Sequence, residues 1–227
     1  MNIRFLGHAC FELSDGDTRV LIDPFLTGNP KAAVSADEVD PTHIFLTHGH
    51  SDHYGDIVDI AKRTKAQVVA IVELAGELGE QGVENVSDPN IGGTVTFDDV
   101  GLSVRLTPAW HTSTTPNGLV NTPAGLVIGL GGKVVYHLGD TGLFSDLQLP
   151  GQRDEIDVAL MCIGGHYTMD RHDAVRAAEL VGAKQVIPCH YDTFPPIETN
   201  ARAFQSEVDS QTSSEAIILE PGDSHSI

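Results

Sequence analysis

The segment Thr47-His48-Gly49-His50-Ser51-Asp52-His53 places three imidazoles and one carboxylate close together in the chain. Side chains two residues apart on an extended segment point the same way, so His48 and His50 can approach one metal ion from one side. Asp52 and His53 fall where the chain is expected to enter a helix, which directs them at a neighbouring point. Imidazole and carboxylate ligands without thiolate suit zinc, manganese, iron or nickel. The segment therefore predicts a metal centre.

This run is similar to the Thr-His-x-His-x-Asp-His signature of the metallo-β-lactamase superfamily. The rest of that pattern follows in order, with His111 in Pro-Ala-Trp-His-Thr, Asp140 in Leu-Gly-Asp-Thr-Gly and His190 in Pro-Cys-His-Tyr. Other phrases, such as Phe-Leu-Gly-His-Ala and Ile-Gly-Gly-His-Tyr-Thr-Met, look like those of a branch described only as metal-dependent hydrolases. That branch is akin to the ascorbate-6-phosphate lactonases and, more distantly, to the N-acyl-phosphatidylethanolamine phospholipase D proteins. The match spans nearly the whole chain.

The resemblance implies a centre of two divalent metal ions, zinc before manganese, iron or nickel. It implies that the first ion is held by His48, His50 and His111, the second by Asp52, His53 and His190, with Asp140 bridging the two. Two such ions can share one hydroxide, and coordination lowers the pKa of a bound water to about 7. A nucleophile is then available at neutral pH without a serine or a cysteine. Because Asp52 is expected to hold one of the ions that activate this water, we expect it to be a catalytic residue as well as a ligand.

Five further residues are candidates for supporting roles. His8 follows a predicted strand, and it either lines the site, adds a ligand or is a hydrogen-bonded structural histidine. Asp23, at the Ile-Asp-Pro position of the family, is expected to orient a ligand histidine. His166 lies in a Gly-Gly-His loop, and we expect it to contact substrate or to donate the proton that a leaving oxygen needs. Thr141 and Tyr191 adjoin ligands and are expected to support them from behind.

Other residues that are able to bind metals or substrates have simpler explanations. Trp110 is expected to be a packing anchor, with a place at the border of the substrate cleft as the alternative. Cys189 is expected to be a small buried residue, with a soft metal ligand as the alternative. Four histidines are expected to be structural or solvated: His43, His137, His172 and His225.

Charge and cysteine content restrict the class of protein. Thirty-two acidic residues against thirteen basic ones leave a formal net charge of −19. Such a surface repels phosphate backbones and anionic membranes, so a small-molecule substrate is expected instead of nucleic acid or a membrane. The three cysteines are widely separated, which argues against disulfides and for a reducing compartment. The first residues lack an apolar signal region, so the protein is expected to be cytoplasmic. The oligomeric state stays open, a homo-oligomer included.

Hydrophobic periodicity predicts alternating strands and helices. Strands are expected at 2–6, 10–13, 19–23, 44–47, 67–72, 94–97, 102–107, 126–130, 134–138, 157–163, 185–187 and 216–219. Helices are expected at 52–64, 73–80, 170–181 and 197–208. Strands in both halves with helices between them predict a four-layer αββα sandwich, the metallo-β-lactamase fold, over one domain of residues 1–227.

We therefore expect a hydrolase that cleaves a phosphodiester or a lactone-like ester of a small metabolite with a metal-bound hydroxide. A non-catalytic metal-binding or regulatory module is the alternative. A di-iron oxidoreductase is a more distant one, because flavin-partnered members of the fold carry a glutamate in the first motif, where this chain has His50.

The acidic composition suggests a protein that works in high salt, where dense carboxylates hold hydration and their mutual repulsion is screened. The free energy of unfolding, measured by urea titration at rising potassium chloride, is then expected to increase. An unchanged or falling free energy would contradict this interpretation.

Overall fold

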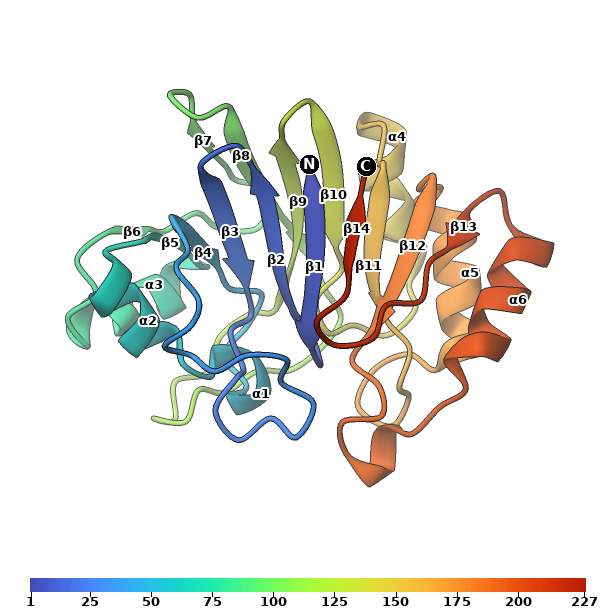
Figure 1. The fold of residues 1–227 in the computed structure, drawn as a ribbon, viewed down its shortest axis with the longest axis horizontal. Coiled ribbons are helices and arrows are strands. Elements are labelled where there is room, and N and C mark those ends of the chain that lie inside the picture. The colour runs from blue at the N-terminus through green and yellow to red at the C-terminus, as the bar shows by residue number, and fades with distance from the viewer.

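The computed structural model describes all 227 residues, which form two seven-stranded sheets packed face to face (Figure 1). The first sheet has the order β14-β1-β2-β3-β4-β5-β6. Its strands are β1 Asn2–Gly7, β2 Cys10–Asp15, β3 Thr18–Ile22, β4 His43–Phe45, β5 Gln67–Val69, β6 Val86–Ser87 and β14 Ser224–Ser226. Strands β1 to β3 pair antiparallel, and β3 to β6 pair parallel.

The second sheet repeats this arrangement in the order β13-β12-β11-β10-β9-β8-β7. Its strands are β7 Thr94–Phe97, β8 Leu102–Pro108, β9 Ala124–Leu130, β10 Lys133–His137, β11 Val158–Cys162, β12 Gln185–Cys189 and β13 Glu215–Ala216. Strands β7 to β10 are antiparallel, and β10 to β13 are parallel. Strand β11 is buried at every position, as a parallel strand covered on both faces requires.

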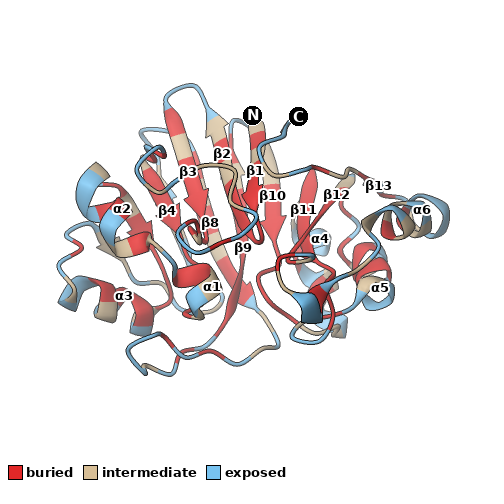
Figure 2. Cartoon of the chain, turned by 60° about the horizontal axis from the view of Figure 1, so that its bottom comes forward, coloured by how far each residue is buried: buried red, intermediate tan, exposed pale blue.

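Helices cover the outer faces of both sheets. Beside the first sheet lie α1 Ser51–Tyr54, α2 Ile57–Thr64 and α3 Val72–Glu80. Beside the second lie α4 Gln148–Arg153, α5 Arg171–Val181 and α6 Ala201–Gln211, with short 3-10 turns η1 Ser145–Leu147 and η2 Pro195–Ile197. Figure 2 shows the buried strands between helices that expose one side. The predicted αββα sandwich is confirmed.

Two apolar clusters hold the layers together. A cluster of 40 buried residues contains inward-facing side chains of both sheets, such as Ile3, Ile22, Val104 and Ile128. A second cluster of 20 residues joins the outer face of the second sheet to its helices. The larger cluster is common to both sheets, and one domain over residues 1–227 stays a prediction.

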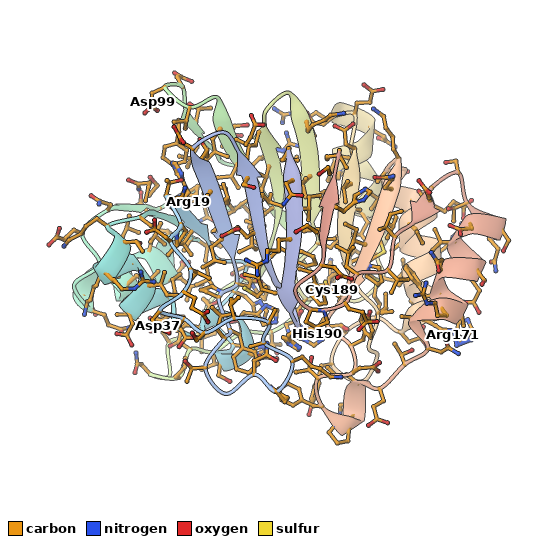
Figure 3. All side chains as sticks on the ribbon, in the orientation of Figure 1. Arg19, Asp37, Asp99, Arg171, Cys189 and His190 are labelled. Carbon is orange, nitrogen blue, oxygen red and sulfur yellow. The ribbon has the colours of Figure 1, made fainter.

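The strand directions determine where functional residues gather. Because β2 is antiparallel to both β1 and β3, and β4 is parallel to β3, the carboxyl ends of β1, β3 and β4 lie on the same side of the first sheet. By the same pairing, β8, β10, β11 and β12 end together in the second sheet. Ligands of open α/β sheets bind outside the carboxyl ends of strands. In Figure 3, Cys189 and His190 lie at this lower edge.

Several predicted boundaries differ from the structure. The expected helix at 52–64 is two helices, because Gly55 adopts a positive φ of 39° between α1 and α2. The expected helix at 197–208 begins at Ala201, where Asn200 caps it through the backbone N–H of Ala203. Short elements without a strong periodic pattern were not predicted: β6, β14, η1, α4 and η2.

Two predictions about the chain as a whole concern its cysteines and its hydrophobic segments. Cys10, Cys162 and Cys189 are all free and buried, which confirms the absence of a disulfide framework. None of the helices combines the length and the apolar composition that crossing a bilayer requires.

Gly55 is expected to be essential for the junction that follows the ligand-bearing segment. A Cβ on Gly55 would overlap the carbonyl oxygen of Pro24, and its φ of 39° disfavours other residues. Gly55→Ala should therefore lower the free energy of unfolding by about 3 kcal/mol, from backbone strain and overpacking together. Gly16→Ala is the control, with a positive φ of 55° but open space around it, and should cost about 1 kcal/mol. Equal losses in urea titrations would contradict the steric argument.

Candidate metal centre

All seven predicted ligands follow the carboxyl ends of strands at one edge of the molecule. His48, His50, Asp52 and His53 follow β4, and they come from the first sheet. The other three come from the second sheet, where His111 follows β8, Asp140 follows β10 and His190 follows β12. The two sheets therefore contribute to one cluster, and a hydrogen bond of 2.7 Å from His190 N to the carbonyl of His8 joins them there.

The first group of ligand atoms comprises His48, His50 and His111, whose donor atoms lie within 4.8 Å of one another. His50 Nδ1 lies 3.1 Å from His48 Nε2 and 3.3 Å from His111 Nε2. Gly49 allows this spacing, because a Cβ there would meet the Asn121 side chain at 2.6 Å. These are the three residues that the family resemblance assigns to a first ion.

The second group comprises His8, Asp52, His53 and His190. His8 Nε2 lies 3.1 Å from Asp52 Oδ2, and His190 Nε2 lies 3.7 Å from the same oxygen. The sequence left the place of His8 open, and the structure puts its buried ring within this group, with Nδ1 2.8 Å from the hydroxyl of Thr193.

Asp140 lies between the two groups. Its Oδ1 is 3.4 Å from His53 Nε2, and its Oδ2 is 3.0 Å from His190 Nε2. The same Oδ2 is 3.6 Å from His111 and 3.9 Å from His48, which belong to the first group. A carboxylate in contact with imidazoles of both groups is placed as a bridging ligand would be.

Unpaired ring nitrogens indicate that the cluster suits a cation. His53 Nε2 and both ring nitrogens of His190 are buried and have no hydrogen-bond partner. His190 Nε2 is close to Asp140, but not in hydrogen-bond geometry. Buried polar atoms without partners cost about 1–3 kcal/mol each. A divalent ion would coordinate the two Nε2 atoms, so the donor set fits a metal.

Asp23 and Thr47 determine which nitrogen of two ligands is free. His53 Nδ1 donates to Asp23 Oδ2 at 2.7 Å, so Nε2 is the nitrogen that would coordinate a metal ion. The hydroxyl of Thr47 donates its only proton to the same carboxylate at 2.6 Å. Its oxygen therefore accepts from His48 Nδ1 at 3.0 Å, and the lone pair of the His48 ring is then on Nε2. The buried Asp23 carboxylate thus orients one histidine in each group.

Burial and neighbouring charges shift the pKa values in opposite directions across the cluster. Burial lowers the pKa of His48 well below its usual value, and it lowers that of His8 to about 4 with help from His190. For His190, burial opposes protonation, but the Asp140 carboxylate outweighs it and raises the pKa to about 9. The pKa of Asp140 lies well below its usual value, because the imidazoles around it outweigh its own burial. A metal ion competes with protons for these lone pairs, so binding should release protons.

The backbone is strained where the strands end at the cluster. Six non-glycine residues have positive φ, and four of them are His8, Asp23, His166 and His190. Such conformations persist where the surrounding structure fixes them, and they concentrate at functional sites. The strain is therefore consistent with a site whose geometry matters more than local stability.

Comparisons with known proteins identify the family of this chain. Residues 18–191 match the family model described as a beta-lactamase superfamily domain. The chain belongs to the beta-lactamase superfamily. It is also 48% identical to a UPF0173 metal-dependent hydrolase of Methanopyrus kandleri, over 99% of both chains. A protein of the same name from Natranaerobius thermophilus is 43% identical over 99% of this chain and 98% of its own.

A solved structure extends the family comparison to the fold. The metallo hydrolase Igni18 of the hyperthermophilic archaeon Ignicoccus hospitalis superposes with a TM-score of 0.90 and 36% identity, over 99% of this chain and 97% of its own. The family predicted from the sequence is therefore confirmed. The relation to ascorbate-6-phosphate lactonases stays a prediction.

The other residues predicted for supporting roles differ in how far they are buried. The buried Thr141 accepts a hydrogen bond from the backbone N–H of Trp110, next to His111. Tyr191 is half-buried and lines a separate cavity behind His8. His166 is exposed, and its ring stands edge-on to that of Tyr167 at 4.4 Å. Its proposed contact with substrate stays a prediction.

The structure corrects one expectation and resolves others. Trp110 is 72% exposed, so it is not a packing anchor, because its neighbour His111 turns into the cluster and leaves the indole outside. Cys189 is buried outside every ligand group. His137 is structural, with Nδ1 accepting from Gly139 N. His225 lies in β14, where it bonds Gln185 of β12 at 2.8 Å.

Sequence reasoning missed the apolar walls of the site. The cavity over the ligands has a volume of about 340 Å³, and its walls include Phe25, Tyr167 and Phe194. Each lies within a few residues of a predicted site residue, namely Asp23, His166 and His190. That proximity was a usable signal, although an aromatic residue in a loop is by itself uninformative.

Asp23→Asn tests the orientation of the ligand histidines. An amide nitrogen in place of Oδ2 cannot accept from His53 Nδ1, so the ring would shift its proton to Nε2 and lose its lone pair there. Metal affinity, measured by competition with a chromogenic chelator, should fall about 10- to 100-fold. Asp157→Asn is the control, because Asp157 binds Val134 N and Lys184 outside the site. Unchanged affinity in Asp23→Asn would show that Asp23 does not set the tautomer.

Proposed function

We propose that this protein is a metal-dependent hydrolase with a two-ion centre, acting on a phosphodiester or a lactone-like ester of a small molecule. The observation that carries the proposal is the position of Asp140, in contact with the imidazoles of both ligand groups. The names of the similar proteins, which are metal-dependent hydrolases, support the same class.

Each of the two ions would have its own set of ligands. His48, His50 and His111 would hold one ion, and Asp52, His53 and His190 the other, with Asp140 between them. Bound divalent ions, with zinc the first expectation, lower the pKa of a coordinated water and supply hydroxide at neutral pH. The carboxylates of Asp52 and Asp140 offset part of the added positive charge. The His8 ring, fixed between Thr193 and Asp52, keeps that carboxylate directed at the cluster.

Hydrolysis also needs a proton for the leaving oxygen, and ligand imidazoles have no lone pair or proton to spare. His166 is proposed for this role, because it is exposed beside the cavity residue Tyr167 and its backbone is held at a φ of 54°. An exposed imidazole can give a proton to a leaving oxygen and be reprotonated by water. His166 would act when the loop that carries it brings the ring to a bound substrate.

Metal analysis of the freshly purified protein, followed by a screen of cyclic nucleotides, phosphodiesters and lactones, tests the proposed class. Turnover should disappear after dialysis against a chelator and return when zinc or manganese is added. Two bound metals with no turnover of any ester would favour the non-catalytic binding module instead.

Asp52→Ala and His166→Ala test two different roles, that of a metal ligand and that of a proton donor. Asp52→Ala should lower metal content and reduce kcat at least about 100-fold, because an ion loses its only non-bridging carboxylate. His166→Ala should keep its metal and lose about 10²- to 10⁴-fold in kcat, as expected for general-acid catalysis. His172→Ala, an exposed histidine of α5, is the control and should change neither quantity. Full activity in Asp52→Ala would refute its assignment, and loss of metal in His166→Ala would make that residue a ligand.

A further inference from the structure

The walls of the cavity above the ligand cluster contain no lysine or arginine. Apart from the ligand side chains and Ser51, they consist of the aromatic residues Phe25, Tyr167 and Phe194. Enzymes that bind multiply charged phosphates rely on cationic side chains to hold the non-reacting oxygens. This cavity offers none, and the protein as a whole carries a net charge of −19, which repels anions on approach.

The aromatic walls are built by loops from both sheets. Phe25 follows β3 and Phe194 follows β12, and their ring centroids lie 6.4 Å apart. Both rings also contact His8, with centroids at 5.7 Å and 5.6 Å. This pair is therefore a fixed apolar surface directly beside the second ligand group.

The third aromatic wall residue, Tyr167, is exposed to water. Its side chain is 56% exposed, and it adjoins His166 in the chain. Large aromatic side chains in contact with water at a binding cavity mark surfaces that gain free energy when a ligand covers them. A volume of about 340 Å³ limits that ligand to a small molecule.

We infer that the substrate is an uncharged ester or lactone with an aromatic or similarly apolar substituent, which packs against Phe25, Phe194 and Tyr167. The inference rests on the proposed hydrolase. Of the two bonds proposed there, it favours the uncharged lactone-like ester over the anionic phosphodiester. Hydrolysis breaks the acyl C–O bond, forms a new bond from the water oxygen to the acyl carbon and transfers a water proton to the leaving oxygen. The products are a carboxylic acid and an alcohol, and no oxidant or reductant takes part.

Three probe substrates separate the contribution of charge from that of the apolar group. Dihydrocoumarin is neutral and aromatic, γ-butyrolactone is neutral without an aromatic ring, and bis(p-nitrophenyl) phosphate is aromatic but anionic. With kcat/KM divided by the rate constant for hydroxide in solution, dihydrocoumarin should exceed each of the others at least tenfold. Metal-dependent turnover that favours the phosphodiester would overturn this inference and leave the proposed hydrolase standing. No turnover of any probe would count against the hydrolase itself.

A binding measurement tests the apolar walls without catalysis. Acetohydroxamate and benzohydroxamate carry the same metal-binding group and differ in the phenyl ring. Calorimetry on the metal-loaded protein should give a dissociation constant about tenfold lower for benzohydroxamate. Equal dissociation constants would overturn the inference whatever the activity.

Variants of Tyr167 complete the test. Tyr167→Ala should reduce the tenfold preference for benzohydroxamate to threefold or less, and Tyr167→Phe should retain it. Leu149→Ala, an equally exposed apolar residue outside this cavity, is the matched control and should leave the preference unchanged. Tyr167→Arg adds a cation to the wall and should shift the ratio of kcat/KM toward the phosphodiester at least tenfold. An unchanged ratio in Tyr167→Arg, with the hydroxamate preference unaffected by Tyr167→Ala, would refute the role of this wall.

Discussion

The buried Asp140 carboxylate, surrounded by imidazoles from both sheets, is the interaction on which the site depends. A buried carboxylate is costly unless positive charge or hydrogen bonds compensate it. Here His53 and His190 lie within 3.4 Å, and the imidazoles of the first group lie slightly further away. The imidazole nitrogens that compensate Asp140 as proton carriers can coordinate a cation once those protons are released. A centre for cations follows from the packing of these groups.

The sandwich makes that packing possible. Each sheet consists of an antiparallel part followed by a parallel part, so the strands that carry ligands end at one edge. The large core cluster fixes the two sheets against each other, and the site inherits this rigidity. Local strain at His8, Asp23 and His190 is tolerated because the strands on either side are buried and fully paired. Asp23 also orients two ligand rings, His53 by a direct hydrogen bond and His48 through the hydroxyl of Thr47.

Local patterns allowed the fold and the first ligand motif to be predicted, whereas the division of seven residues into two ligand sets came from the family resemblance. Buried strands such as 158–162 stand out as apolar runs, and three histidines with an aspartate directly after a strand have few structural explanations. The role of His8 stayed open, since only the folded sheet brings a residue after β1 within 3.1 Å of Asp52, which follows β4. The break at Gly55 was missed because a single glycine in a helical pattern is often tolerated. The exposure of Trp110 depends on the turn taken by its neighbour, which no periodicity encodes.

The most direct test of the two-ion centre is anomalous X-ray scattering from crystals grown with zinc or manganese. Two peaks are expected on either side of Asp140. One should lie among His48, His50 and His111, and the other among Asp52, His53 and His190. A single peak, or none at saturating metal, would contradict the role of Asp140 as a bridge between two ions.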